Sequence, residues 1–129
     1  MLKKHGLNGN EKVLILKGLC LAGEKKYKAA IVRYDRVSSY EYKSAAASAT
    51  ALAYIELGQF DKAREKTDVI ERNQGQQDAE WVRYRINQAE AKTKGMPEPV
   101  RSKALTNWSD EWLLDSVLNN RYVYWKGTL

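Results

Sequence analysis

Apolar side chains recur along most of this chain at intervals of three and four residues, the spacing of one face of an α-helix. The clearest example is Ala51–Ile70, ALAYIELGQFDKAREKTDVI, where a broad apolar face is interrupted at the letters LGQF. Gly58 permits the backbone conformation that ends a helix, and Asp61 places a carboxylate at the favourable start of the next one. The segment therefore predicts two amphipathic helices joined by a tight turn, with Phe60 and Ala63 wedged between them.

The same periodicity predicts further helices on both sides of this hairpin. The predicted ranges are Glu11–Ala22, Lys26–Ser39, Glu41–Leu57, Asp61–Arg72, Ala79–Lys94, Val100–Leu105, and a last helix from Asn107 or Ser109 to Arg121. Asp78 is expected to cap the helix that follows it, and Gly95 with Pro97 to end that helix. Residues 1–9 are predicted to form a flexible basic arm. An all-α fold follows from this order of elements.

The central hairpin has an upstream counterpart, in which Tyr27 and Ala30 are spaced like Phe60 and Ala63. Further positions match at the same interval: Gly18, Leu21, Ala22, Tyr34 and Val37 in the first unit, and Ala51, Tyr54, Ile55, Thr67 and Ile70 in the second. A fixed period of this length is typical of stacked helical hairpins, none of which can bury its apolar face alone. A weaker third copy begins near Trp81.

These positions resemble the tetratricopeptide repeat family, in which a small residue and an aromatic residue precede a turn glycine and a second aromatic–alanine pair follows. The residues that carry the resemblance are Tyr54, Leu57, Gly58, Phe60 and Ala63, and Gly18, Leu21, Tyr27, Ala30 and Tyr34. Lys25 stands where the family has its turn glycine. The resemblance covers residues 10–106 and implies stacked antiparallel hairpins in a superhelix. Residues 107–129 would then form a C-terminal aromatic capping or interaction helix and tail.

The resemblance also implies a concave groove, lined by the first helix of each hairpin, that holds a segment of another protein. Transferred to this chain, the groove residues are Lys12, Ile15, Leu19, Ser48, Leu52, Ile55, Val82 and Ile86. An apolar lining of this kind suits an amphipathic or aliphatic segment, as in a small adaptor or chaperone. The competing interpretation is that the same side chains form only the internal core.

Charge separates the first hairpin from the rest of the chain. Up to Lys43 there are ten Lys and Arg residues against four Asp and Glu residues, whereas the remainder has twelve of each. The predicted basic patch consists of Lys25, Lys26, Lys28, Arg33 and Arg36. Such a surface attracts acidic proteins or nucleic acid, so the alternative function is a structural component of a larger assembly that docks through this hairpin. No nucleic-acid recognition motif accompanies the charge, which makes nucleic acid the less favoured partner and a solvated helix surface the simplest explanation.

Residue types that carry chemistry are scarce. The single histidine, His5, lies in the predicted arm, so no Ser-His or Cys-His couple and no metal-ligand spacing is present. The glycines do not form a phosphate-binding loop. Neither an enzymatic activity nor a cofactor is therefore expected. The single cysteine, Cys20, lies in the apolar run Val13–Leu21, which favours a buried and unreactive thiol.

Aromatic residues crowd into Trp108–Trp125, which contains three of the four tryptophans. We expect Trp112, Val117 and Leu118 to pack on the third hairpin. Tyr122, Tyr124 and Trp125 are then left to form an interface with another protein or a second copy of the chain. In the alternative, the whole segment folds back as a cap.

The hydropathy pattern also bears on localisation. No apolar run approaches the ~20 residues of a membrane span, and no signal-peptide pattern follows the basic start of the chain. A cytoplasmic protein without membrane contact is predicted.

Overall fold

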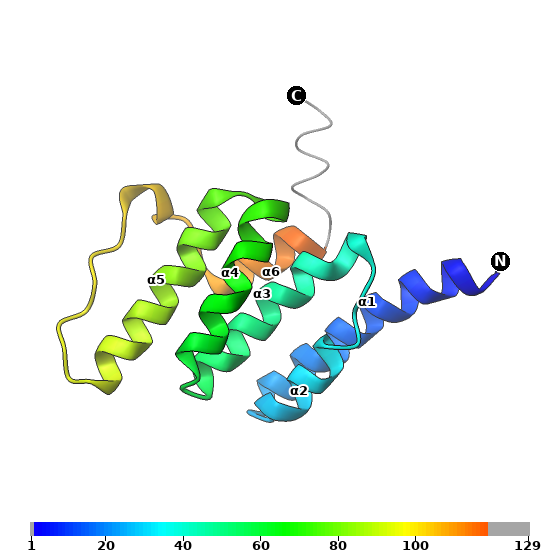
Figure 1. Cartoon of the computed structure of the whole chain (residues 1–129), viewed down its shortest axis with the longest axis horizontal. Coiled ribbons are helices and arrows are strands. Elements are labelled where there is room, and N and C mark those ends of the chain that lie inside the picture. Colours follow the sequence, from blue (N-terminus) through cyan, green and yellow to red (C-terminus); the bar gives the residue numbers. More distant parts are fainter. Residues whose placement is uncertain (1, 119–129) are drawn as a thin grey trace.

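The computed structural model describes the backbone of residues 2–118, with side chains over 11–39 and 42–115, and all regular structure in this part is helical (Figure 1). The elements are α1 (Leu2–Gly23), α2 (Tyr27–Tyr34), α3 (Tyr40–Glu56), α4 (Phe60–Gln74), α5 (Gln76–Thr93), the short 3-10 helix η1 (Lys103–Leu105) and α6 (Asp110–Leu118). The all-α prediction is confirmed. Within the described residues, none of the helices has the length and hydropathy needed to cross a membrane.

Two hairpins, α1/α2 and α3/α4, form the body of the molecule, and in each the two helices lie side by side and run in opposite directions (Figure 1). Their turns have the same geometry. Lys25 has a φ of 65° and Gly58 a φ of 75°, both in the left-handed region. The amide of Lys26 donates to the carbonyl of Leu21 at 2.8 Å, and at the matched position of the second hairpin the amide of Gln59 donates to the carbonyl of Tyr54 at 2.9 Å.

The central helix is α3, which packs against α1, α2, α4, α5 and α6. Its sequence explains this position, because buried alanines around most of the helix allow neighbours to approach α3 closely from several directions. These alanines are Ala45, Ala46, Ala47, Ala49, Ala51 and Ala53. The described core divides into two clusters, one formed by α1, α2 and one face of α3, the other by a second face of α3 together with α4 and α5.

The first hairpin closes through one very close approach. A Cβ atom added at Gly18 would lie 2.3 Å from Cε1 of Tyr34, so only glycine leaves room for this ring. Tyr34 is 2 % exposed and fills the space between α1 and α2. The residues at the matched positions of the second hairpin, Ala51 and Thr67, are also buried. Thr67 is smaller than Tyr34, so glycine is not needed at the position of Ala51.

Two predicted loops at the ends of helices are shorter than expected. Residues 2–9, predicted as a flexible arm, belong to α1, since the chain contains no proline before Pro97 and glycine weakens a helix without ending it. The polar loop expected between α4 and α5 is reduced to Gly75, whose φ of 112° makes the turn alone. Consequently α5 begins at Gln76, and Asp78 does not cap it.

A third hairpin is absent from the described residues. After α5 the chain turns at Gly95, which has a φ of 69°, and then continues without regular structure to η1. Pro97 and Pro99 account for this, because each lacks an amide donor and disfavours helical backbone in the residue before it. The predicted helix Val100–Leu105 is therefore only the single turn Lys103–Leu105.

Candidate functional site

The predicted groove residues separate into two groups in the structure. Lys12, Leu19 and Leu52 are half-buried. The other five are at most 3 % exposed and belong to the interior: Ile15, Ser48, Ile55, Val82 and Ile86. In this arrangement of the chain, only the first group could be reached by a partner without movement of another element.

The element that covers this side of the molecule is α6, which packs along α3 and lies behind it in the view of Figure 1. Leu113 is completely buried in the same cluster as Ile55 and Val82. Its neighbour Leu114 packs against the other cluster, which contains Ile15. Two adjacent leucines of α6 thus reach both halves of the core.

A reciprocal pair of tryptophan–aspartate hydrogen bonds anchors the C-terminal segment to α5. The indole Nε1 of Trp108 donates to Asp78 Oδ1 at 2.9 Å, and the Nε1 of Trp81 donates to Asp110 Oδ1 at 2.9 Å. The guanidinium of Arg85 adds a charge-assisted contact, with its Nε 3.2 Å from both carboxylate oxygens of Asp110. Each segment therefore supplies one indole donor and one carboxylate acceptor to the other.

Asp78 is the buried centre of a wider polar network. It is 4 % exposed, and its Oδ2 accepts a hydrogen bond from Gln74 Nε2 at 3.0 Å. Gln74 in turn accepts a hydrogen bond from the Ser48 hydroxyl at 3.0 Å. Burial raises the pKa of Asp78, against the opposing effect of the hydrogen bonds from Trp108 and Gln74. The residue predicted to cap α5 instead joins α3, α4, α5 and the segment that leads into α6.

Arg101 fixes the extended segment that precedes η1. Its guanidinium carbon lies 4.8 Å from the ring centre of Trp81 and 5.4 Å from that of Tyr84. Cation–π contacts of this geometry hold the segment against the outer surface of α5.

The part of α6 that packs into the core differs from the prediction. Trp112 is 39 % exposed and contacts Trp108 edge to face at 6.4 Å, whereas Leu113 is the buried residue. Trp112 was predicted to pack on a third hairpin, which is absent from the described residues, and the α6 residue that enters the core is its neighbour Leu113. The side chains of Val117 and Leu118, and the predicted aromatic interface of Tyr122, Tyr124 and Trp125, lie outside the described residues.

A hollow of about 530 Å³ lies beside these anchors. It is lined by Glu56, Arg85, Gln88, Ala89, Lys92, Met96 and Glu98. Its α5 residues were missed by the sequence analysis, which named Val82 and Ile86 on the neighbouring, buried side of the helix. The interval between the matched residues Tyr27 and Phe60 also leads from Leu52 to Arg85 and from Ile55 to Gln88. Applying the repeat period to the groove residues would therefore have identified these two residues of the hollow.

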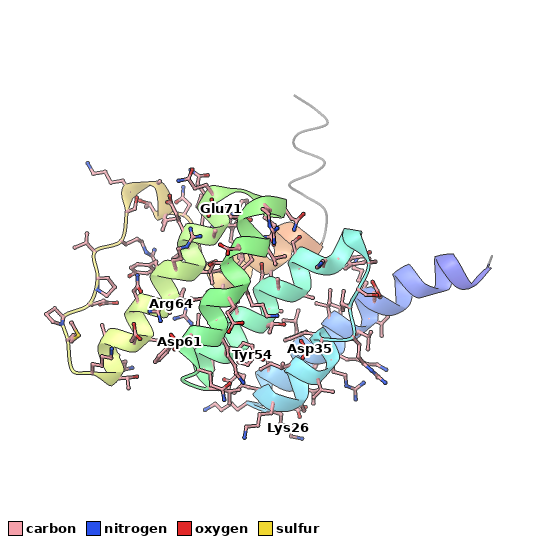
Figure 2. All side chains as sticks on the ribbon, viewed as in Figure 1. Lys26, Asp35, Tyr54, Asp61, Arg64 and Glu71 are labelled. Atoms are coloured by element: carbon pink, nitrogen blue, oxygen red, sulfur yellow. The ribbon has the colours of Figure 1, made fainter. Side chains whose placement is uncertain are left out.

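The predicted basic patch lies on the turn and outer side of the first hairpin. Lys25, Lys26, Lys28 and Arg36 are exposed, and Arg33 is half-buried. Figure 2 shows Lys26 at the tip of this hairpin, where its Nζ lies 3.2 Å from the Glu24 carboxylate. Lys25, Lys26 and Lys28 thus lie at or beside the turn of the first hairpin, whereas Arg36 follows the other end of α2.

Cys20 lies on the outer side of α1, so the prediction of a buried thiol is wrong. Glu11, Ile15 and Gly18 face inward, whereas Val13, Leu16 and Cys20 are turned outward by the helical period. Because α1 is apolar on both sides, its sequence alone did not distinguish the inner face from the outer one.

Within the described residues, no three His, Cys, Asp or Glu side chains are grouped in a way that could hold a metal ion. We compared the chain with models of known protein families, with curated proteins and with solved structures, and none of the three searches found a match. The proposals that follow are built on the residues of this chain.

Proposed function

We propose that this protein is a tetratricopeptide-like interaction module, a small adaptor or chaperone, that binds an amphipathic helical segment of a partner protein. The binding site would be the α6-covered face, the side of α3 against which Leu113 and Leu114 pack. The observation that carries this proposal is that the face already receives an amphipathic helix, α6 of the chain itself. A surface that buries one such helix has the shape and polarity to receive another.

Two features support the tetratricopeptide-like arrangement. The left-handed turn positions Lys25 and Gly58 are separated by the repeat period and are followed by equivalent hydrogen bonds. In the first hairpin the small residue of the first helix, Gly18, meets the large residue of the second, Tyr34. Gly18, Tyr34 and Gly58 are positions at which the sequence resembles the family, and Lys25 adopts the turn conformation at the position where the family has glycine.

The contacts of α6 define the chemistry of the expected partner segment. Adjacent leucines enter the two core clusters, and Asp110, three residues before Leu113, binds Trp81 and Arg85. A competing segment would therefore present a carboxylate followed after one helical turn by two aliphatic side chains. Such a segment would replace α6, so the contacts between α6 and this face must first be released. A substitution that weakens those contacts should therefore increase the apparent affinity of the protein for the segment.

A peptide comprising residues 107–118 tests this proposal directly. Its binding to the full chain would be measured by fluorescence anisotropy, with Asp110→Asn to weaken the resident α6 and Glu111→Gln as the matched control at an exposed carboxylate. We expect Asp110→Asn to bind the peptide about tenfold more tightly than the wild type, and the control to be unchanged. A peptide with alanine at both leucines should not bind.

A second variant establishes where the peptide lies. Leu52 is half-buried against the cluster that contains Leu113, so Leu52→Asp should abolish peptide binding to the Asp110→Asn chain. Circular dichroism would establish that each variant retains its helicity. Folded Asp110→Asn protein that fails to bind the peptide, or that binds the alanine peptide equally well, would contradict the proposal.

A further inference from the structure

We propose that the outer side of the first hairpin is a second docking surface, which binds an acidic amphipathic segment of a partner protein. Its centre is an apolar stripe on α1. Val13 is 44 % exposed, Leu16 is 45 % exposed and Cys20 is also exposed. These residues are three and four positions apart and therefore lie on one side of the helix. The opposite side of α1 carries the buried residues that contact α2 and α3.

Exposed apolar residues are concentrated in this hairpin. Six large hydrophobic side chains are exposed among the described residues, and three of them, Val13, Leu16 and Val32, belong to α1 or α2. Val32 is 62 % exposed, although its neighbour Ile31 is buried. None of the six comes from α3 or α4, so the described part of the second hairpin has no comparable surface.

The exposed cations of the first hairpin are largely uncompensated. Five basic residues in the described part of the hairpin are exposed: Lys17, Lys25, Lys26, Lys28 and Arg36. Of these, only Lys26 forms an ion pair within the residues that the structure describes, and its partner Glu24 is equally exposed.

The remainder of the chain has equal numbers of basic and acidic residues, and several of its cations are paired within the molecule. Arg64 of α4 lies 2.6 Å from Glu90 and 3.3 Å from Asp61, and Figure 2 shows Arg64 and Asp61 close together beside α4. Arg83 pairs with Glu71 at 2.8 Å in the same region. These arginines of the second half are neutralised within the molecule, whereas the lysines of the first hairpin retain their charge for a partner.

Charge complementarity identifies the occupant. A segment that buries Val13 and Leu16 must be apolar along one side. A segment that is also attracted to Lys17 on α1 and to the other exposed lysines of the hairpin must carry carboxylates outside that apolar side. A second copy of the same surface would bring like charges together. Nucleic acid would pair phosphates with the lysines but would leave the apolar stripe without a complementary surface. An acidic amphipathic helix satisfies both the apolar and the charged requirement.

The described elements leave this surface uncovered. In Figure 1, α1 lies at the edge of the helical body, and its N-terminal part extends beyond α2 and α3. Among the described elements, α1 packs mainly against α2 and α3, both on its inner side. The site is therefore separate from the α6-covered face, and its occupation requires no movement of α6.

The experiment uses three probes and measures binding to the full chain by fluorescence anisotropy. The first probe is a helical peptide with a leucine stripe and glutamates elsewhere, about five turns long. The others are polyglutamate of the same length and a short DNA duplex. We expect the amphipathic peptide to bind at least about tenfold more tightly than either of the others, at salt of about 0.15 M.

Substitutions on the hairpin locate the site. Leu16→Glu should weaken binding of the amphipathic peptide about tenfold or more. Lys17→Glu combined with Lys28→Glu should weaken binding similarly and flatten its salt dependence. Val100→Glu is the matched control, since Val100 is 93 % exposed and lies far along the chain from the hairpin. All of these positions are exposed, and unchanged circular dichroism would establish that the variants fold.

Several results would overturn the proposal. Binding that survives Leu16→Glu, or that is equally tight for polyglutamate, would eliminate the apolar stripe as a recognition element. Equal or tighter binding of DNA would assign the charge to nucleic acid. Self-association that Leu16→Glu abolishes would assign the surface to a second copy of the chain. Asp110→Asn should leave peptide binding here unchanged, so failure of this proposal and failure of the α6-covered site can be distinguished.

Discussion

The two hairpins have the same turn and the same spacing but different surroundings. The second hairpin is enclosed, because α3 contacts α1, α2, α5 and α6 besides its own partner, and α4 lies between α3 and α5. The first hairpin is packed on one side only and leaves Val13, Leu16 and Val32 exposed. Two hairpins with the same turn geometry therefore differ in exposure: the second is enclosed by neighbouring helices, and the first has an open outer surface. The number of neighbouring helices causes this difference.

The largest expected effect is a loss of stability when the matched alanines, Ala30 and Ala63, are enlarged. Both are completely buried, and the comparison tests whether the second hairpin is more tightly enclosed than the first. Ala63→Leu should lower the free energy of unfolding by about 3 kcal/mol, because α4 has neighbours on two sides and cannot shift. Ala30→Leu should cost about 1 kcal/mol less, since α2 can move outward. Urea denaturation measures both. Equal losses of stability in the two variants would contradict the contrast between the hairpins. An unchanged melting curve for Ala63→Leu would contradict the alignment of the two repeats, in which Ala63 is a tightly packed helix contact.

The next effect concerns the close approach in the first hairpin. Gly18→Ala should cost about 2 kcal/mol, because the new methyl group would overlap the buried ring of Tyr34. In a Tyr34→Thr background, which copies the Thr67 of the second hairpin, the added cost of Gly18→Ala should largely disappear. A thermodynamic cycle from four denaturation curves checks this. Additive losses would indicate that Gly18 is needed for another reason.

The connection between the hairpins gives a pH-dependent effect. Glu11 of α1 accepts hydrogen bonds from the amides of Ser38 and Ser39, at 3.1 Å and 3.0 Å, just before α3 begins. Burial raises the pKa of Glu11, but the hydrogen bonds from Ser39 and Ser38 together bring it below its usual value. The carboxylate therefore contributes stability that is complete above the ordinary glutamate pKa of 4.5 and is lost as the pH falls through the lowered value.

Glu11→Gln should accordingly cost about 1–2 kcal/mol near neutral pH. The difference between variant and wild type should shrink as the pH is lowered below the pKa of an ordinary glutamate. Denaturation at a series of pH values measures it, with Glu24→Gln as an exposed control on the same hairpin. A difference that is constant with pH would show that the ionised form makes no special contribution.

The smallest effect is a gain in stability. Lys25 adopts a left-handed conformation that glycine occupies without steric cost, as Gly58 does in the second hairpin. Lys25→Gly should raise the free energy of unfolding by about 1 kcal/mol, and Gly58→Lys should lower it by about the same amount. Differential scanning calorimetry detects both shifts. A loss of stability in Lys25→Gly would mean that the lysine side chain stabilises the turn.

The sequence was sufficient to predict the helical class, because helix formation follows the local periodicity of apolar residues. It was not sufficient where one helix has two plausible faces. In α1 the apolar run covers both sides, so the exposure of Cys20 depends on where α2 and α3 pack. In α6 the choice between Trp112 and Leu113 depends on how the helix is rotated against α3.

Long-range polar contacts were also inaccessible to local patterns. Asp78 near a helix start is a normal N-cap on propensity alone, but one of its two side-chain donors, Trp108, comes from the segment after α5 and η1. The absence of a third hairpin from the described residues, by contrast, could have been anticipated, since Pro97 and Pro99 limit helix formation directly after α5.

The position of Leu113 has a consequence for the order of folding during synthesis. It completes a core cluster with Ile55, which lies on the far side of α4 and α5 in the sequence. Until α6 leaves the ribosome, α3 to α5 are available but their α6-covered face is not closed. Contacts of such long sequence separation form late, and a partly made chain with an exposed apolar face is prone to aggregate. Ribosome-bound chains that end shortly before Asp110 should therefore be far more sensitive to protease than those that extend beyond α6.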